Sequence, residues 1–296
     1  MASTFLVRYG ELALKSPPVR REFEHTLERN ILDRFRRSDL ACRLRSDHGH
    51  LYVMTEDAAR GSALLRTVFG VTSVSQVTEV SSEVPAIESA LLTLADPVLA
   101  TGSRFAVRTR RVGTHPFTSQ ELARTLGSAI GVRYADRDLH VDLTHPTVEL
   151  QVEVRGNRTY LSLDRVAGPG GLPLGVAGKL VALVGGDRGA LGAYLMMKRG
   201  CATAVVTDGE GPEFAEEVLR KFSPTLRVQP AEGDAVGALG RLAEQERAEG
   251  IVLPIPVEGY PQARVDWGDR VLFSPTVGFS DAEVAERWEA VQRLAN

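Results

Sequence analysis

The segment 104–124 is rich in arginine, and closely spaced guanidinium groups suit the recognition of phosphate. Its arginines are Arg104, Arg108, Arg110, Arg111 and Arg124. On a strand, Arg108 and Arg110 share one face and Arg111 points to the other. Charges this close repel one another unless an anion or an acid lies nearby, and guanidinium groups bind phosphate oxygens in bidentate fashion. Two interpretations stay open: a surface for nucleic-acid phosphates, and a solvated face paired to Asp and Glu.

Two further groups of polar residues bear on the same question. Thr118 and Ser119 precede a helix-like pattern, where backbone N–H groups and a hydroxyl can add contacts to a phosphate. Either residue suits the N-cap position, with Glu121 close behind. Arg8 and Lys15 lie near the N-terminus in "VRYGELALKS", and taken alone they indicate ordinary surface charge.

A pair of glycines separates an apolar run from a helix-like run in "KLVALVGGDRGALGAYLMMKRG". Backbone N–H groups at Gly185 and Gly186 can approach phosphate at a helix N-terminus. Arg188 supplies charge there or forms a salt bridge, while Lys179 precedes the strand and so does not match a P-loop lysine. The residues that would bind an ATP phosphate are Leu183, Val184, Gly185 and Gly186. The alternative is a tight turn that packs a helix on a sheet.

Composition excludes several classes of protein. The net charge of -3 over 296 residues gives no general basic character, so any nucleic-acid surface must be local. Cys42 and Cys201 cannot build a disulfide framework or a four-ligand zinc site, which indicates a reducing compartment. His48 and His50 flank a glycine and indicate a turn rather than a metal site. We see no signal peptide and no apolar run of about 20 residues, so we expect a cytoplasmic protein without a membrane segment.

The periodicity of apolar residues predicts the elements that position these groups. The first 80 residues read β-α-β-β-α-β, the order of a ferredoxin-like fold, with a long amphipathic helix over 17–37. Next come helix, strand, helix and two strands. A Gly- and Pro-rich linker at 167–179 precedes alternating strands and helices, among them strands 251–257 and 270–277. Alternation predicts a doubly wound parallel sheet, so the fold class is α/β with an α+β N-terminal half.

The chain resembles the 4-thiouridine tRNA sulfurtransferase family, also called the thiamine-biosynthesis sulfurtransferase (ThiI-like) family. The matching pieces are "RYGELALKS" with "FEHTLERNI", "FAVRTRR...HPFTSQEL", "GPGGLPLG", "AYLMMKRG" and "VLFSPTVGFS". The resemblance implies an N-terminal ferredoxin-like domain over 1–60, extending to about 78, a THUMP domain over 61–166, and a truncated Rossmann-like ATP-pyrophosphatase domain over 167–296. It also implies that the first two domains bind tRNA by its acceptor end, which is why Arg8 and Lys15 join the predicted RNA-binding residues.

The chain departs from that family in its glycine loop. Counting back from Ala193 places the family's Ser-Gly-Gly-x-Asp-Ser motif on residues 184–189, where both serines and the acid are missing and Arg188 replaces the acid. The resemblance implies that the serines hold pyrophosphate and that the acid organises Mg-ATP. It also implies a sulfur-carrying cysteine beyond "VLFSPTVGFS", and the sequence shows none there. Cys201 is expected to be a packed thiol.

We therefore expect a tRNA-binding protein with lost or impaired pyrophosphatase chemistry, with no catalytic residue, no metal and no certain cofactor, ATP staying open. Two alternatives stay open as well. One is an active sulfurtransferase that borrows a partner's cysteine, and the other is a nucleotide-sensing regulator without hydrolysis. The expected partners are tRNA and a sulfur-transfer or tRNA-modification protein, and a homodimer is compatible with the sequence.

Overall fold

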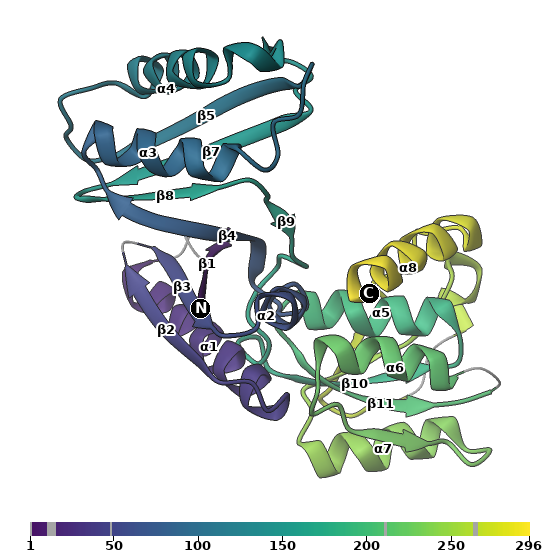
Figure 1. Ribbon diagram of the computed structural model, residues 1–296. Coiled ribbons are helices and arrows are strands. Elements are labelled where there is room, and N and C mark those ends of the chain that lie inside the picture. The colour runs from purple at the N-terminus through teal and green to yellow at the C-terminus, as the bar shows by residue number, and fades with distance from the viewer. Residues whose placement is uncertain (1, 11–15, 48, 210–211, 263–265) are drawn as a thin grey trace. The chain divides into compact units, whose positions relative to one another are not determined.

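The computed structural model describes residues 2–10, 16–47, 49–209, 212–262 and 266–296 (Figure 1). The chain forms two compact units whose segments alternate along the sequence. Unit 1 comprises Met1–Leu6, Tyr52–Ala58 and Ser75–Val166, and unit 2 comprises Val7–Leu51, Ala59–Val74 and Ala167–Asn296. Each unit combines separate stretches of the chain, so this division does not test the predicted domain boundaries near residues 60 and 166. These boundaries stay predictions.

The first 81 residues have the order β-α-β-β-α-β, as predicted. The elements are β1 (Ser3–Tyr9), α1 (Pro17–Arg37), β2 (Cys42–Asp47), β3 (His50–Thr55), α2 (Ala58–Leu65) and β4 (Val71–Ser81). Helix α1 begins with two prolines, which are tolerated in a first turn, and it buries Leu27, Ile31 and Phe35 at spacings of four. The apolar residues that recur with a period of about 3.6 in the sequence therefore form the buried face of this helix.

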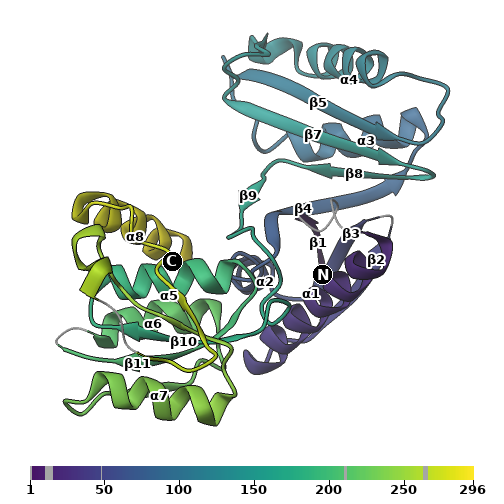
Figure 2. The ribbon, with the colours of Figure 1, turned by 180° about the vertical axis from the view of Figure 1, so that it is seen from behind.

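The next elements form an α+β layer in unit 1. They are α3 (Val84–Ala95), β5 (Arg104–Val112), α4 (Ser119–Arg133), a short 3-10 turn (Ala135–Arg137), β6 (His140–Val141), β7 (Val148–Arg155), β8 (Arg158–Ser162) and β9 (Val166–Ala167). Phe105 and Val107 of β5 pack with Leu126 of α4 and Leu91 of α3 in one apolar cluster. Both helices thus cover the same face of the β5–β7–β8 strands (Figure 2).

The strand order of the larger sheet is β2-β3-β1-β4-β8-β7-β5-β6, with β9 paired to β4. Strand β5 is parallel to β7 and to the two-residue β6, whereas β7 and β8 are antiparallel. The register places Arg108 beside Gln151 and Arg110 beside Glu153. The arginine-rich strand therefore lies between a full-length neighbour and a very short one.

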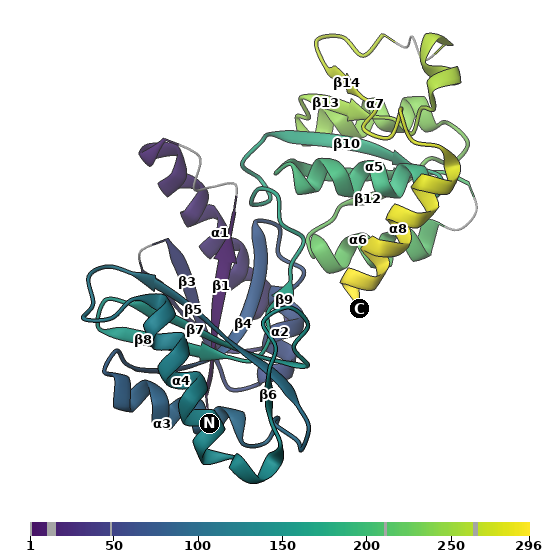
Figure 3. The same cartoon turned by 90° about the horizontal axis from the view of Figure 1, so that it is seen from above.

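The second sheet is parallel throughout and has the order β12-β11-β10-β13-β14. Its elements are β10 (Lys179–Val184), α5 (Asp187–Lys198), β11 (Ala202–Thr207), α6 (Pro212–Phe222), β12 (Val228–Pro230), α7 (Ala235–Glu246), β13 (Gly250–Val252), a 3-10 turn (Val257–Gln262), β14 (Val271–Phe273) and α8 (Asp281–Ala295). One apolar cluster joins α5, α6 and α8 to one face of this sheet, and a second joins α7 to the other (Figures 1 and 3). The predicted doubly wound α/β fold is confirmed.

Two strands of this sheet are shorter than predicted. The sequence pattern extends the first over 251–257, but β13 ends at Val252. Pro254 and Pro256 follow, and neither can donate a backbone N–H to a neighbouring strand. The predicted strand over 270–277 is likewise reduced to β14, and Pro275 follows it closely.

The Gly- and Pro-rich segment 167–179, expected to be a linker, is packed against its neighbours over residues 168–175. The Leu172 N–H donates to the Lys198 carbonyl (2.9 Å), and the Gly70 N–H donates to the Gly170 carbonyl (2.8 Å). A Cβ on Gly171 would collide with the Lys198 carbonyl oxygen, so glycine is required by this close approach. The segment joins the end of α5 to the start of β4 within unit 2.

A buried arginine fastens α1 to α6 inside unit 2. Arg34 donates to the Phe222 carbonyl (2.8 Å), the Lys221 carbonyl (2.5 Å) and the Thr67 carbonyl (3.3 Å). Lys221 and Phe222 end α6, where carbonyl groups lack partners within the helix. Burial lowers the pKa of Arg34 to about 10, which reflects the cost of holding its charge there.

Candidate functional site

The arginines of β5 are divided between the two faces of their strand. Phe105 and Val107 point into the core under α3 and α4, so Arg111 lies on the helix side. Arg108 and Arg110 lie on the opposite face. The division of Arg108 and Arg110 from Arg111 is the one that strand alternation predicts.

On the face away from the helices, acids compensate part of the positive charge. Arg108 donates to Glu149 (Nε to Oε1, 2.9 Å) and to the Leu143 carbonyl (2.6 Å). Arg104 lies 3.8 Å from Asp142. Arg110 is exposed, and its guanidinium has no hydrogen bond or ion pair with any residue that the structure describes. The acid-paired interpretation thus fits Arg104 and Arg108, whereas the guanidinium of Arg110 is not paired to an acid among the described residues.

On the helix side, the start of α4 is capped by its own residues. The Glu121 N–H donates to Thr118 Oγ1 (3.2 Å), and the Thr118 N–H donates to the Glu121 carboxylate (2.7 Å). This backbone N–H lowers the pKa of Glu121. The Ser119 carbonyl accepts from Thr109 Oγ1 (2.5 Å). The Thr118 hydroxyl is therefore engaged in a capping box.

The remaining cations near this helix start are Arg111 and Arg124. Arg111 donates through Nη1 to the Gly113 carbonyl (3.1 Å), which leaves its other N–H groups available. Arg124 is exposed on α4, and its side chain has no hydrogen bond or ion pair within the described ranges. Arg8, in contrast, is buried with an exposed fraction of 8%, and Lys15 lies outside the described residues.

The glycine loop lies at the carboxyl end of β10, next to a cavity of about 450 Å³. The sheet order reverses between β10 and β13, and this is where ligands of doubly wound sheets bind. Helix α5 starts there after Gly186 without a side-chain cap, so its first N–H groups have no partner within the helix. The cavity is lined by Leu183, Gly185, Gly186, Asp187, Arg188, Gly189, Asp208, Pro254, Asp281, Val284 and Ala285. Val184 does not line it, because its side chain packs in the core beneath α5.

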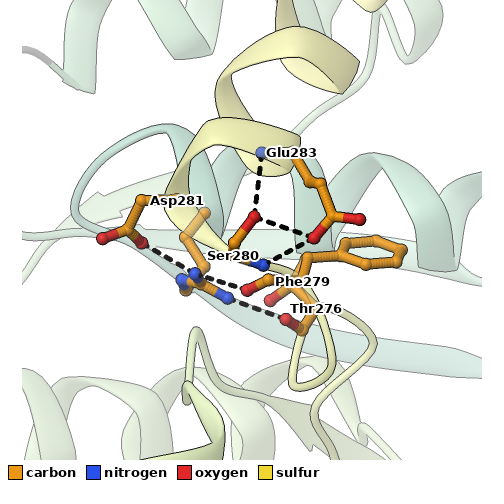
Figure 4. A network of polar contacts seen from close by, with 6 residues as sticks. Thr276, Phe279, Ser280, Asp281 and Glu283 are labelled. Carbon is orange, nitrogen blue, oxygen red and sulfur yellow. Dashed lines mark hydrogen bonds and ion pairs between the residues drawn. The ribbon is translucent and has the colours of Figure 1, made fainter.

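Arg188 is held by the segment that leads into α8. Its guanidinium donates to the Thr276 carbonyl (2.7 Å), the Phe279 carbonyl (2.8 Å) and Asp281 (2.8 Å), and only 14% of the side chain is exposed. Figure 4 shows this network around the first turn of α8. The guanidinium is thus already occupied by protein oxygens.

Gly189 is closed in by the strand that precedes the loop. A Cβ at this position would lie 2.5 Å from the Leu183 carbonyl oxygen and 2.9 Å from the Val184 Cα. Both neighbours are backbone atoms and cannot move aside cheaply. No side chain, and in particular no serine, fits at 189 without displacing β10.

The family models match the two N-terminal parts of the chain. The ThiI ferredoxin-like domain matches residues 4–75, and the THUMP domain matches residues 81–164. The chain belongs to the ThiI-like THUMP proteins. Together with the curated relatives named next, these matches confirm the resemblance to the 4-thiouridine tRNA sulfurtransferase family.

Curated relatives of this ThiI-like chain are named as probable tRNA sulfurtransferases. The protein of Methanothermobacter thermautotrophicus is 38% identical over 230 residues, which are 75% of this chain and 57% of the relative. The protein of Saccharolobus islandicus is 32% identical over 255 residues, 82% of this chain and 66% of the relative. The chain thus spans about three fifths of the length of such relatives.

Two solved structures share the fold of this ThiI-like chain over almost its whole length. PH1313 from Pyrococcus horikoshii has a TM-score of 0.81 at 23% identity, covering 98% of this chain and 99% of that one. A 4-thiouridine synthetase in complex with RNA and bound ATP has a TM-score of 0.79 at 22% identity, covering 100% and 86%. At these identities the likeness concerns the fold alone.

The glycine loop of this ThiI-like chain does not fit the Mg-ATP chemistry that the resemblance implies. The positions expected to hold serine, acid and serine are a buried valine, an arginine bound to protein oxygens and a glycine with no space for a side chain. Among the described residues, no three His, Cys, Asp or Glu side chains are grouped so that they could hold one metal ion. Backbone N–H groups of Gly185 and Gly186 are what the loop retains for an anion.

Several cavity residues were missed by the sequence analysis. Asp208 directly follows β11, and an acid after a strand of a parallel sheet is a signal that could have been used. Asp281 and Val284 come from α8, nearly 100 residues after the loop. No local sequence pattern indicates that they lie at the cavity. Cys201 is buried and donates to the Ala177 carbonyl (3.3 Å), as expected of a packed thiol. No described helix is long and apolar enough to cross a membrane.

Proposed function

We propose that this chain binds tRNA through its THUMP-containing part and that its own glycine loop does not carry out ATP-dependent adenylation. The observation that supports RNA binding is Arg110, an exposed guanidinium that has no partner among the described residues. It lies next to Arg111 on β5, and Arg124 belongs to the helix that follows. A related fold has been solved as an RNA complex, and relatives are named for tRNA modification.

The physical basis of the proposal is the exchange of counterions for guanidinium groups. Each Arg that contacts a phosphate releases condensed counterions, so affinity falls with salt by a slope of about 0.7–0.9 per contact. Arg108 contributes less to phosphate affinity and to the salt slope, because Glu149 already pairs with it. The chain's mild net charge means that these few local cations must supply the binding. We place the acceptor end of tRNA there because the family resemblance implies it.

The test compares two double variants in gel shifts with tRNA between 50 and 200 mM salt. Arg110→Ala with Arg111→Ala should lower the salt slope by about 1.5 and weaken binding, with little change in unfolding midpoint. Arg241→Ala with Arg293→Ala removes the same charge from exposed sites of unit 2 and should leave binding unchanged. Parental binding no tighter than that of an acidic control protein would overturn the proposal, as would equal loss in both variants.

The catalytic part of the proposal concerns the loop and has its own assay. Phosphoryl chemistry depends on positioned charge, and positions 184, 188 and 189, where the resemblance implies Ser, Asp and Ser, carry neither a hydroxyl nor a carboxylate. Incubation with tRNA, Mg²⁺, ATP and a sulfur donor should yield no pyrophosphate and no 4-thiouridine. Either product above a no-protein background, lost in Gly186→Trp, would favour a sulfurtransferase that uses a partner's cysteine.

A second candidate function is ligand sensing without turnover. The cavity beside the loop favours it, because about 450 Å³ at the switch point of a parallel sheet is enough for a small molecule. Thermal-shift measurements with ATP, with and without Mg²⁺, test the nucleotide-sensing version. Stabilisation without hydrolysis would support it, and unchanged melting up to 5–10 mM (about the highest practical concentration) would exclude ATP as the ligand.

A further inference from the structure

The cavity at the glycine loop has the charge of a site that disfavours phosphate. The acidic residues Asp187, Asp208 and Asp281 line it, against a single arginine. The guanidinium of that arginine, Arg188, already donates to two carbonyls and to Asp281. A triphosphate entering here would meet two uncompensated acids and no available cation. Coulomb repulsion between like charges is screened less in a concave site than in open solvent.

The remaining walls of the cavity suit an uncharged ring. Leu183, Pro254, Val284 and Ala285 contribute apolar surface from β10, from the loop after β13 and from α8. Small-molecule sites combine such apolar walls with a few polar groups that fix orientation. A planar heterocycle placed against this side would leave its polar substituents facing the loop and the acids.

Asp208 lies at the carboxyl end of β11, a position from which an acid in a parallel sheet can bind the hydroxyls of a ribose. It directly follows β11, the strand next to β10, and comes 22 residues after Gly186. In βαβ nucleotide folds, an acid at the end of the second strand, about 20 residues after the glycines, accepts from the ribose diol. The backbone holds this residue in place, because the Asp208 N–H donates to the Val184 carbonyl (3.0 Å). Asp208 is exposed and lines the cavity, and its carboxylate has no hydrogen bond or ion pair within the described ranges.

We propose that this cavity binds a nucleoside whose 5′ substituent is neutral or cationic, held by its ribose diol on Asp208, and that it discriminates against 5′-triphosphates. Asp187 lies in the first turn of α5, where a phosphate would otherwise lie, and its charge favours a neutral or positive substituent at that point. The inference concerns unit 2 and does not depend on RNA binding by the arginines of unit 1.

The experiment is isothermal titration of the full chain, freed of RNA, with adenosine, guanosine, cytidine and uridine and with the four 5′-triphosphates plus Mg²⁺. At least one nucleoside should bind at least tenfold more tightly than its triphosphate, and its 2′-deoxy form should bind at least tenfold more weakly. Asp208→Asn should lower affinity by a similar factor. Asp39→Asn, an exposed acid at the end of α1 in the same unit, serves as the matched control and should change nothing.

A second variant keeps the test valid if Asp208→Asn alters the fold. Ala285→Trp fills the cavity from the exposed side of a helix, and it should abolish nucleoside binding while α8 stays folded. Tighter binding of a triphosphate than of its nucleoside, no nucleoside binding at millimolar concentration, or unchanged affinity in both variants would each overturn the proposal. The Arg110→Ala, Arg111→Ala variant should bind nucleoside normally, so failure here is distinguishable from failure of RNA binding.

Discussion

Replacing Arg188 by methionine tests whether the altered glycine loop has become a structural clamp. Methionine keeps most of the side-chain volume and removes every donor. The Thr276 and Phe279 carbonyls would then lose the partner that now satisfies them, and the loop before α8 would lose its attachment to α5. The change thus isolates hydrogen bonding from packing.

The expected loss of unfolding free energy follows from the three contacts of Arg188. A hydrogen bond to a charged group contributes roughly 1.5–3 kcal/mol, and two such bonds go to carbonyls in a part-buried setting. The third partner, Asp281, is 99% exposed, so its ion pair adds at most about 1 kcal/mol. Water will compensate part of the loss, and we expect a decrease of about 2–4 kcal/mol in the free energy of unfolding of this region.

The assay is hydrogen exchange at residues 276–284 together with urea unfolding. A loss of about 3 kcal/mol corresponds to exchange roughly 100-fold faster in this segment, if it opens locally. Arg293→Met removes an exposed i,i+4 pair with Glu289 and should change the free energy of unfolding by no more than about 0.5 kcal/mol. Arg188→Asp restores the acid expected from the family, and it should be less stable still, because a carboxylate would face two carbonyl oxygens.

Two outcomes would refute the reasoning about Arg188. One is an Arg188→Met protein as stable as the Arg293→Met control and with unchanged exchange at 276–284. The other is an Arg188→Asp protein that is as stable as the parent and binds Mg-ATP more tightly. Either would mean that the observed contacts are incidental and that the loop is one substitution away from a nucleotide site.

Three further predictions follow from buried groups of unit 2. Gly189→Ser should destabilise the fold by about 2–3 kcal/mol in urea unfolding, because its Cβ would meet the Leu183 carbonyl, whereas Gly240→Ser, in open space on α7, should cost far less. Arg34→Met should cost about 3 kcal/mol by leaving carbonyls at the end of α6 unpaired, and an unchanged midpoint would contradict this. Burial raises the pKa of Tyr194 to about 12, so the phenol ionises at lower pH in the unfolded chain than in the folded one. The contribution of Tyr194 to stability should therefore be complete below pH 10 and decline between pH 10 and 12. In pH-dependent melting, Tyr194→Phe should flatten that decline.

The sequence by itself determined the elements whose signals are local. The apolar period of 17–37 predicted α1, and Thr118 or Ser119 with Glu121 close behind marked the start of α4, because capping and periodicity depend only on residues within one or two turns. The alternation of strands and helices after residue 179 was enough to predict a parallel sheet. The glycine pair then placed the candidate site at the end of β10, since loops at carboxyl ends of strands converge there.

Tertiary structure decided which charged groups are engaged. Glu149, which pairs with Arg108, lies 41 residues away, and the partners of Arg188 lie 88–93 residues away. No window of sequence shows that one arginine of the cluster is neutralised while Arg110 is not. The same holds for Gly189, whose lack of space comes from the path of the preceding strand in three dimensions. Charge and packing between distant segments depend on the assembled fold, and for that reason the roles of these residues could not be predicted from their neighbours in the chain.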